Sequence, residues 1–199
     1  MIEQALEIFG KNSFQHAIFY SNEQCLRFGL SEESEQESYV RMFTSALQKS
    51  TQIIDTVFEK SDELSICLAF SGDGYLSNFS VFKYLKQLQI KIPEENYKFQ
   101  EWDIDDESNR NYLFFKINKS ELHKILFGKL GAELGIKPSF WFDVYIYDIE
   151  LGVLAHPYDD RGMDIVGTNK VMIKNIYKKY HSWLLNYDLK IMREWCGAL

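Results

Sequence analysis

Apolar and polar positions along this chain follow two different periods, which predict both helices and strands. A period near 3.6 residues is typical of an amphipathic helix. Its clearest stretch covers residues 35–59 and follows the capping-box pattern Ser34-x-x-Glu37. Further helices are predicted over residues 2–9, 81–90, 121–134 and from 169 to about 184, with a last turn or two between Asp188 and Trp195. Gly10 and Gly135 follow two of these helices, Ser120 precedes another, and Thr168 or Asn169 caps the long C-terminal one.

Short apolar or alternating runs bounded by turn residues predict the strands. They cover residues 17–20, 26–30, 64–70, 98–104, 112–117, 140–148, 153–158 and 163–166. Several of them are joined by short polar segments, as in antiparallel hairpins. Neither an internal repeat nor a linker divides the chain. The pattern therefore predicts an α+β fold, a single domain over residues 1–199 with an antiparallel or mixed sheet flanked by helices.

Composition narrows the classes of protein that fit this pattern. The chain has 199 residues, of which 46% are hydrophobic, and a net charge of −7. So many apolar residues exclude an intrinsically disordered chain, and the acidic balance argues against a general nucleic-acid binder. No apolar run reaches the roughly 18 residues of a membrane span, and the N-terminus lacks the features of a signal peptide. With three scattered cysteines, Cys25, Cys67 and Cys196, these features predict a soluble cytoplasmic protein.

The densest polar group covers residues 156–164, from the end of one predicted strand to the start of the next. Its histidine and three carboxylates could bind a metal or serve as acid and base, but their spacing fits neither an EF-hand loop nor a zinc helix. A structural or interaction loop is therefore favoured. We expect Gly162 at positive φ and a partly buried Arg161 clamped by Asp159, Asp164 or Asp143, in that order. The candidate residues are His156, Tyr158, Asp159, Asp160, Arg161, Gly162 and Asp164.

A second candidate lies on the predicted strand over residues 140–148. Because side chains alternate along a strand, one face would carry Trp141, Asp143, Tyr145 and Tyr147. This aromatic face is equally compatible with a surface for a ligand or partner and with the buried second face of a central strand.

Two other patterns receive a plainer interpretation. Gly72-Asp73-Gly74 lies between a strand and a helix, as in a dinucleotide fingerprint, but Ser77 occupies the third glycine position, so a tight turn is favoured. Lys170, Lys174 and Lys178 form a basic stripe that contrasts with the acidic remainder of the chain. Such a stripe could contact an acidic partner, although a solvated helix face is the commoner explanation.

The run Tyr158-Asp159-Asp160-Arg161-Gly162-Met163-Asp164 resembles an uncharacterised bacterial family, domain of unknown function 3885. The resemblance continues through residues 176–188 and through the pair Ile18-Phe19-Tyr20 and Leu26-Arg27-Phe28, so it covers most of the chain. It implies a small soluble bacterial protein and no particular activity.

No convincing catalytic set accompanies this compact acidic chain, and we expect neither a cofactor nor a metal. The leading hypothesis is a non-catalytic protein-binding module, in one version an immunity-type inhibitor of a toxin. Its acidic surface would steer it to a protein with a basic surface, and not to nucleic acid or a membrane. The alternative is a nucleotide- or metal-dependent enzyme using residues 156–164.

Overall fold

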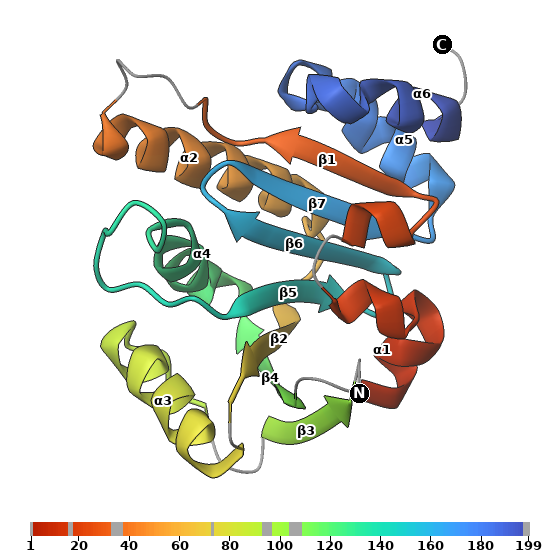
Figure 1. Ribbon diagram of the computed structural model, residues 1–199. Helices are drawn as coiled ribbons and strands as arrows, with labels where there is room; N and C mark the ends of the chain where they lie inside the picture. The colour runs from red at the N-terminus through yellow and green to blue at the C-terminus, as the bar shows by residue number, and fades with distance from the viewer. Residues whose placement is uncertain are drawn as a thin grey trace.

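A seven-stranded antiparallel sheet forms the centre of the protein and carries helices on both faces (Figure 1). The computed structural model describes residues 2–15, 18–32, 38–72, 74–92, 97–103 and 109–196. The strand order is β1-β7-β6-β5-β2-β4-β3. The strands are β1 Cys25–Gly29, β2 Glu63–Ser71, β3 Tyr97–Asp103, β4 Asn109–Asn118, β5 Asp143–Asp148, β6 Val153–Asp159 and β7 Gly162–Gly167. The predicted α+β class with an antiparallel sheet is therefore confirmed.

The helices divide between the two faces of this sheet. They are α1 Ile2–Phe9, α2 Tyr39–Val57, α3 Gly74–Gln87, α4 Leu122–Leu130, α5 Lys170–Lys179 and α6 Leu189–Cys196. In Figure 1, α1 lies in front of the sheet, whereas α2 and α4 lie behind it. The described residues also form short 3-10 turns: η1 Lys11–Phe14, η2 Ile18–Ser21, η4 Lys119–Glu121, η5 His181–Trp183 and η6 Asn186–Asp188. None of the described helices is long and apolar enough to cross a membrane.

The front face of the sheet carries a row of polar and aromatic side chains. In register, Arg27 of β1 pairs with Asp164 of β7, and Asp164 pairs with His156 of β6. Directly paired residues project their side chains to the same face, and the row continues through Tyr145, whose ring stacks on His156 with centroids 4.5 Å apart. The N-terminal segment, which contains the turns η1 and η2, covers this row. Phe14 of η1 contacts Tyr145, and Phe19 of η2 contacts Arg27.

Phe14 anchors the N-terminal segment in the hydrophobic core. Its ring centroid lies 5.5 Å from that of Tyr145, 5.7 Å from that of Tyr147 and 6.1 Å from that of Phe114. All four side chains are buried, and edge contacts of this kind add to the free energy of apolar burial. The N-terminal segment is therefore part of the core.

Some predicted elements need correction. The strand over residues 17–20 is wrong in its described part, because Ile18–Ser21 forms the 3-10 turn η2. A short apolar run buries its side chains equally well in either conformation, so periodicity does not separate the two. The long helix begins at Tyr39, where the Ser38 hydroxyl accepts a bond from the Arg41 N–H at 3.3 Å. The predicted capping box at residues 34–37 lies outside the described residues.

Other helix boundaries differ from the predicted ones by several residues. Helix α3 begins at Gly74, the last residue of the predicted glycine turn, and not at residue 81. Asp73 of that turn lies outside the described residues. Helix α4 is preceded by η4, where the Asn118 side chain accepts from the Ser120 N–H at 2.9 Å, so Asn118 caps this turn in place of Ser120. Asn169 caps α5, which ends at Lys179 and not near residue 184.

Candidate functional site

The turn between β6 and β7 is held by its own side chains. The Asp159 carboxylate accepts from the Arg161 backbone N–H at 2.8 Å and from its guanidinium at 2.5 and 3.0 Å. The first-ranked partner of Arg161 is therefore the observed one. The Arg161 side chain is nevertheless 58% exposed, so the expectation that it is partly buried is wrong. The neighbouring Asp160 is buried and accepts from the Ser31 hydroxyl at 3.2 Å.

Gly162 does not occupy the positive-φ position that was predicted. It lies within β7, paired with Gly29 of β1, and the described glycines with positive φ are Gly10, Gly72, Gly135 and Gly152. Close packing explains the glycine instead. A Cβ at this position would meet the Tyr158 hydroxyl and would lie 2.9 Å from the Phe28 carbonyl oxygen. The absence of a side chain lets β1 and Tyr158 approach β7.

Asp164 takes part in a buried ion-pair cluster with Arg27 and Asp188. The Arg27 guanidinium donates to the two Asp164 oxygens at 2.8 and 2.9 Å, a bidentate pair, and lies 3.4 Å from Asp188 Oδ2. The side chains of these residues are 11%, 0% and 2% exposed, in the order Arg27, Asp164, Asp188. Burial raises the pKa of Asp164, and the bonds from Arg27 oppose that rise. We call these three residues the Arg27 cluster.

Aromatic rings enclose the Arg27 cluster. The guanidinium carbon lies 4.6 Å from the ring centroid of Phe19, 4.9 Å from that of Tyr20 and 5.7 Å from that of Tyr158. Such cation–π contacts are strongest where water is excluded. The Tyr20 hydroxyl donates to Asp188 at 3.4 Å, while 62% of the residue remains exposed. Tyr187, next to Asp188 in the chain, is 86% exposed.

His156 is a core residue of the same row. It is fully buried, its Nδ1 lies 2.8 Å from the Val144 carbonyl oxygen, and its ring stacks on Tyr145 at an interplanar angle of 12°. Burial raises the pKa of the Tyr145 hydroxyl well above its usual value. These contacts fix the position of the histidine beneath the N-terminal segment.

The predicted aromatic face is divided between the core and the surface. Tyr145 and Tyr147 lie on the front face of β5 and are fully buried. Trp141 precedes β5, which begins at Asp143, and it is 63% exposed. Alternation along a strand therefore does not extend to Trp141, and the tryptophan stands apart from the two tyrosines.

Asp143 joins two cations at the edge of the front face. It forms ion pairs with Arg110 of β4 and with Lys129 of α4, whose Nζ lies 3.7 Å from Asp143 Oδ1. Lys129 is buried, and desolvation lowers its pKa. This cluster connects the middle of the sheet with a helix on its back face.

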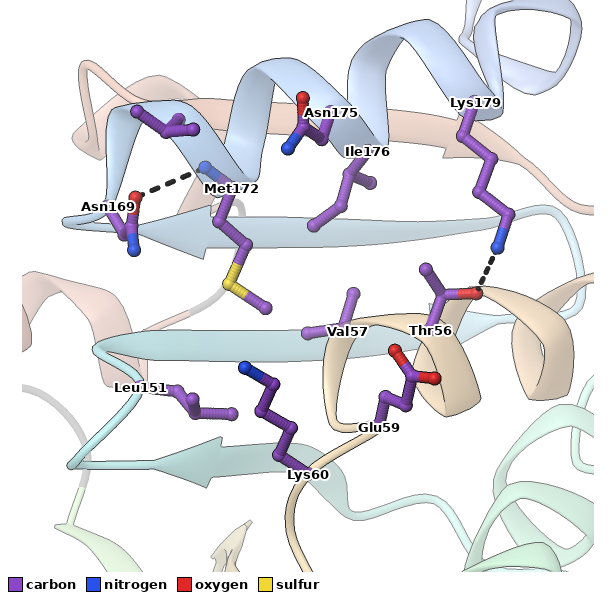
Figure 2. Close-up of a pocket in the computed structure, with 11 residues that line it drawn as sticks. Thr56, Val57, Glu59, Lys60, Leu151, Asn169, Met172, Asn175, Ile176 and Lys179 are labelled. Carbon is purple, nitrogen blue, oxygen red and sulfur yellow. Dashed lines mark hydrogen bonds between the residues drawn. The ribbon is translucent and has the colours of Figure 1, made fainter.

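An open groove of about 420 Å³ lies between the C-terminal end of α2 and the length of α5 (Figure 2). Figure 2 shows Met172, Ile176 and Val57 on its apolar floor, with Lys60 and Lys179 beside them. Leu151 and Val171 also line it. We call it the α2–α5 groove. The sequence predicted a helix here, but it did not indicate that Met172 and Ile176 would line an open surface.

Comparison with known proteins places the chain in a family. The model of the family described as Domain of unknown function (DUF3885) matches residues 1–188. The chain belongs to the DUF3885 family. A curated relative, "Uncharacterized protein YnaE" of Bacillus subtilis (strain 168), is 21% identical over 175 residues, which cover 78% of this chain and 80% of the relative. No solved structure matched the chain. The family resemblance seen in the sequence is confirmed.

The run that carried the DUF3885 resemblance supplies both the β6–β7 turn and Asp164 of the Arg27 cluster. Its carboxylates bind side chains or backbone of the same chain, and no group of three metal-donor residues occurs among the described residues. Neither Arg27 nor Asp188 was predicted as a site residue, although the sequence around Arg27 carries a signal. It is a charged residue within the apolar run Cys25-Leu26-Arg27-Phe28, and charges rarely occupy buried strands without a partner.

Proposed function

We propose that this DUF3885 chain is a non-catalytic protein-binding module whose partner presents a basic surface. The observation that carries the proposal is the pair of exposed tyrosines, Tyr20 and Tyr187, beside the Arg27 cluster. Tyrosine is enriched at protein interfaces because it combines a large apolar ring with a polar end. Two carboxylates against one guanidinium leave an excess of negative charge in the Arg27 cluster, which the Tyr20 ring contacts. A lysine or arginine of the partner would gain both cation–π and Coulomb energy there.

The charge of the whole chain supports the same partner chemistry. A net charge of −7 raises the rate at which a basic protein meets the chain and makes that rate sensitive to salt. An immunity-type inhibitor of a basic toxin domain is the most specific version of the proposal.

Co-expression with a toxin encoded beside the gene tests this version. We expect the wild-type chain to restore growth and Tyr187→Ala to restore it less well. Tyr39→Ala is the matched control, since Tyr39 is 67% exposed but lies at the start of α2. Full protection by Tyr187→Ala would contradict the role of this surface, and failure of the wild-type chain to protect would contradict the inhibitor version.

The enzyme alternative receives less support from the geometry. Asp159, Asp160 and Asp164 are each at most 7% exposed, and each accepts a bond from the same chain. We expect no change in melting temperature with a panel of nucleotides and divalent metals. A ligand that binds the native state raises its stability by RT ln(1 + [L]/Kd). A concentration-dependent rise abolished by Asp160→Asn would therefore favour the enzyme.

A further inference from the structure

The α2–α5 groove extends along the whole of α5. Its lining residues run from Asn169, the N-cap of the helix, to Lys179, its last residue. A helix of 10 residues rises by about 15 Å. The groove is open and follows this length (Figure 2). Its shape therefore fits an elongated occupant, such as a helical segment, better than a compact small molecule.

Apolar side chains form the floor and one wall of the groove. Val171 is 70% exposed, while Met172 and Leu151 are half-buried and Val57 and Ile176 are buried. Methionine adapts its shape to different partners at low energetic cost. An occupant that covers this floor must present an apolar face of its own.

The polar residues of the groove give it a positive charge. Lys179 donates to the Thr56 hydroxyl at 3.0 Å, and the Lys60 ammonium makes no hydrogen bond or ion pair with any described residue. Glu59 is the one carboxylate among the described residues that line the groove. Helix α5 itself carries four lysines and no acidic residue, although the chain as a whole is acidic.

Length, apolar floor and charge together identify one kind of occupant. We propose that the α2–α5 groove binds an acidic amphipathic helix of a partner protein. Leucine-like side chains of that helix cover Met172 and Val171, and its glutamates or aspartates lie against Lys60 and Lys179. The groove is separate from the surface around Tyr20 and Tyr187, and this proposal does not depend on the proposed function.

The test measures fluorescence anisotropy of a labelled helical peptide titrated with the full chain. The peptide carries leucines at positions i, i+3, i+4 and i+7 and glutamates on both flanks of that stripe. Two matched peptides replace the glutamates by lysines or the leucines by glutamines. We expect the acidic amphipathic peptide to bind and both matched peptides to bind at least tenfold more weakly, with affinity falling as salt is added.

Variants of the chain locate the binding in the groove. The double variant Lys60→Glu/Lys179→Glu should weaken binding about tenfold, because two exposed attractions become repulsions. Lys174→Glu, exposed on α5 outside the groove lining, should change it less than twofold. Val171→Asp should weaken binding, whereas Val40→Asp, at a valine that is 66% exposed on α2, should not. Circular dichroism melts verify that each variant is folded.

Several results would overturn the proposal. Absence of binding up to millimolar chain, equal binding of the lysine peptide, or equal loss from Lys174→Glu and the double variant would each do so. Titrations with decanoate and with anionic lipid vesicles distinguish the other occupants. Binding of either one at the groove in place of the peptide would assign the groove to a free anionic amphiphile or to a lipid surface.

Discussion

The sequence correctly indicated that position 162 requires a glycine, but for the wrong physical reason. The sequence indicated a turn glycine with positive φ, whereas the structure places Gly162 in β7 against the Tyr158 hydroxyl and the Phe28 carbonyl oxygen. A motif names the residue type but not the atoms that approach it from other strands. The constraint is therefore steric and arises from tertiary packing, which no local pattern contains.

Gly162→Ala should lower the free energy of unfolding by about 1–3 kcal/mol, the usual cost of overpacking a full site. Tyr158→Phe removes the hydroxyl that the new Cβ would meet, so the alanine should cost less in a Tyr158→Phe background. Denaturant unfolding of the two single variants and the double variant measures this coupling. A cost of the alanine that is the same in both backgrounds would show that Tyr158 is not the obstacle.

The burial of Asp160 leads us to expect that the stability of the fold depends on pH. Burial raises the pKa of Asp160 above the value in the unfolded chain, although the Ser31 hydroxyl opposes this. A carboxyl group with a raised pKa in the folded state loses its proton more easily in the unfolded state. Its contribution to stability therefore falls as pH rises from about 4, the unfolded pKa, through the raised folded pKa.

Asp160→Asn removes this contribution. The variant should therefore gain stability relative to the wild type as pH rises through that window, and the difference should be constant above it. Denaturant unfolding at a series of pH values measures the difference. Asp62→Asn, at an exposed residue, is the control and should show a smaller change. A relative stability of Asp160→Asn that falls with rising pH would contradict the assignment.

Elements with a clear hydrophobic periodicity were predicted well. Elements whose conformation depends on contacts with neighbouring strands were not. Helix α2 and strands β2, β6 and β7 match the periodic stretches closely, because an amphipathic helix and a buried strand each express their burial in the local sequence. Residues 18–21 instead form a 3-10 turn whose Phe19 packs against Arg27. That conformation depends on β1 and β7 beside it, so the short apolar run alone is ambiguous.

The cap of α5 gives an element-scale prediction. The Asn169 side chain accepts from the Met172 N–H at 3.1 Å and satisfies one of the free donors at the start of the helix. Asn169→Ala should lower stability by about 1 kcal/mol, and Asn169→Asp, an equally good cap, should retain it. Thermal or denaturant unfolding measures both. An equal loss in both variants would show that the asparagine acts through another contact.

At the scale of the whole molecule, the sheet brings together strands that are far apart in the sequence. The strand order places β1 beside β7 at one end and β2 between β4 and β5. The C-terminal segment then returns to β1, where the Leu185 N–H donates to the Arg27 carbonyl oxygen at 2.9 Å. Sequence patterns predicted most of these strands and their hairpin neighbours, as in the pairs β3–β4 and β5–β6. They did not predict which distant strands pair, since that is decided by packing. The interleaved order leads us to propose that the chain unfolds in one cooperative transition, as a single domain does.

Arg27 and Arg161 both bind an aspartate, but they act on different scales. Arg161 bonds a residue of its own turn and is largely exposed, so Arg161→Ala should cost no more than about 1 kcal/mol. Arg27 joins β1, β7 and η6 from a largely buried position. Arg27→Ala leaves two buried carboxylates without their cation and should cost about 3–5 kcal/mol.

Hydrogen exchange separates a local loss from a loss of this connection. The exchange rate of the Leu68 amide, in the centre of β2, reports global unfolding. In Arg27→Ala, exchange at the amides of Leu185 and Asp188 should accelerate more than exchange at Leu68. Arg161→Ala should leave the amide of Leu185 unchanged. The reason is that Asp188 and the 183–185 segment are held against β1 partly through the Arg27 guanidinium, so its removal frees the C-terminal segment before the sheet opens. An equal acceleration at Leu185 and Leu68 would instead mean that Arg27 stabilises the fold as a whole without specifically docking its C-terminal segment.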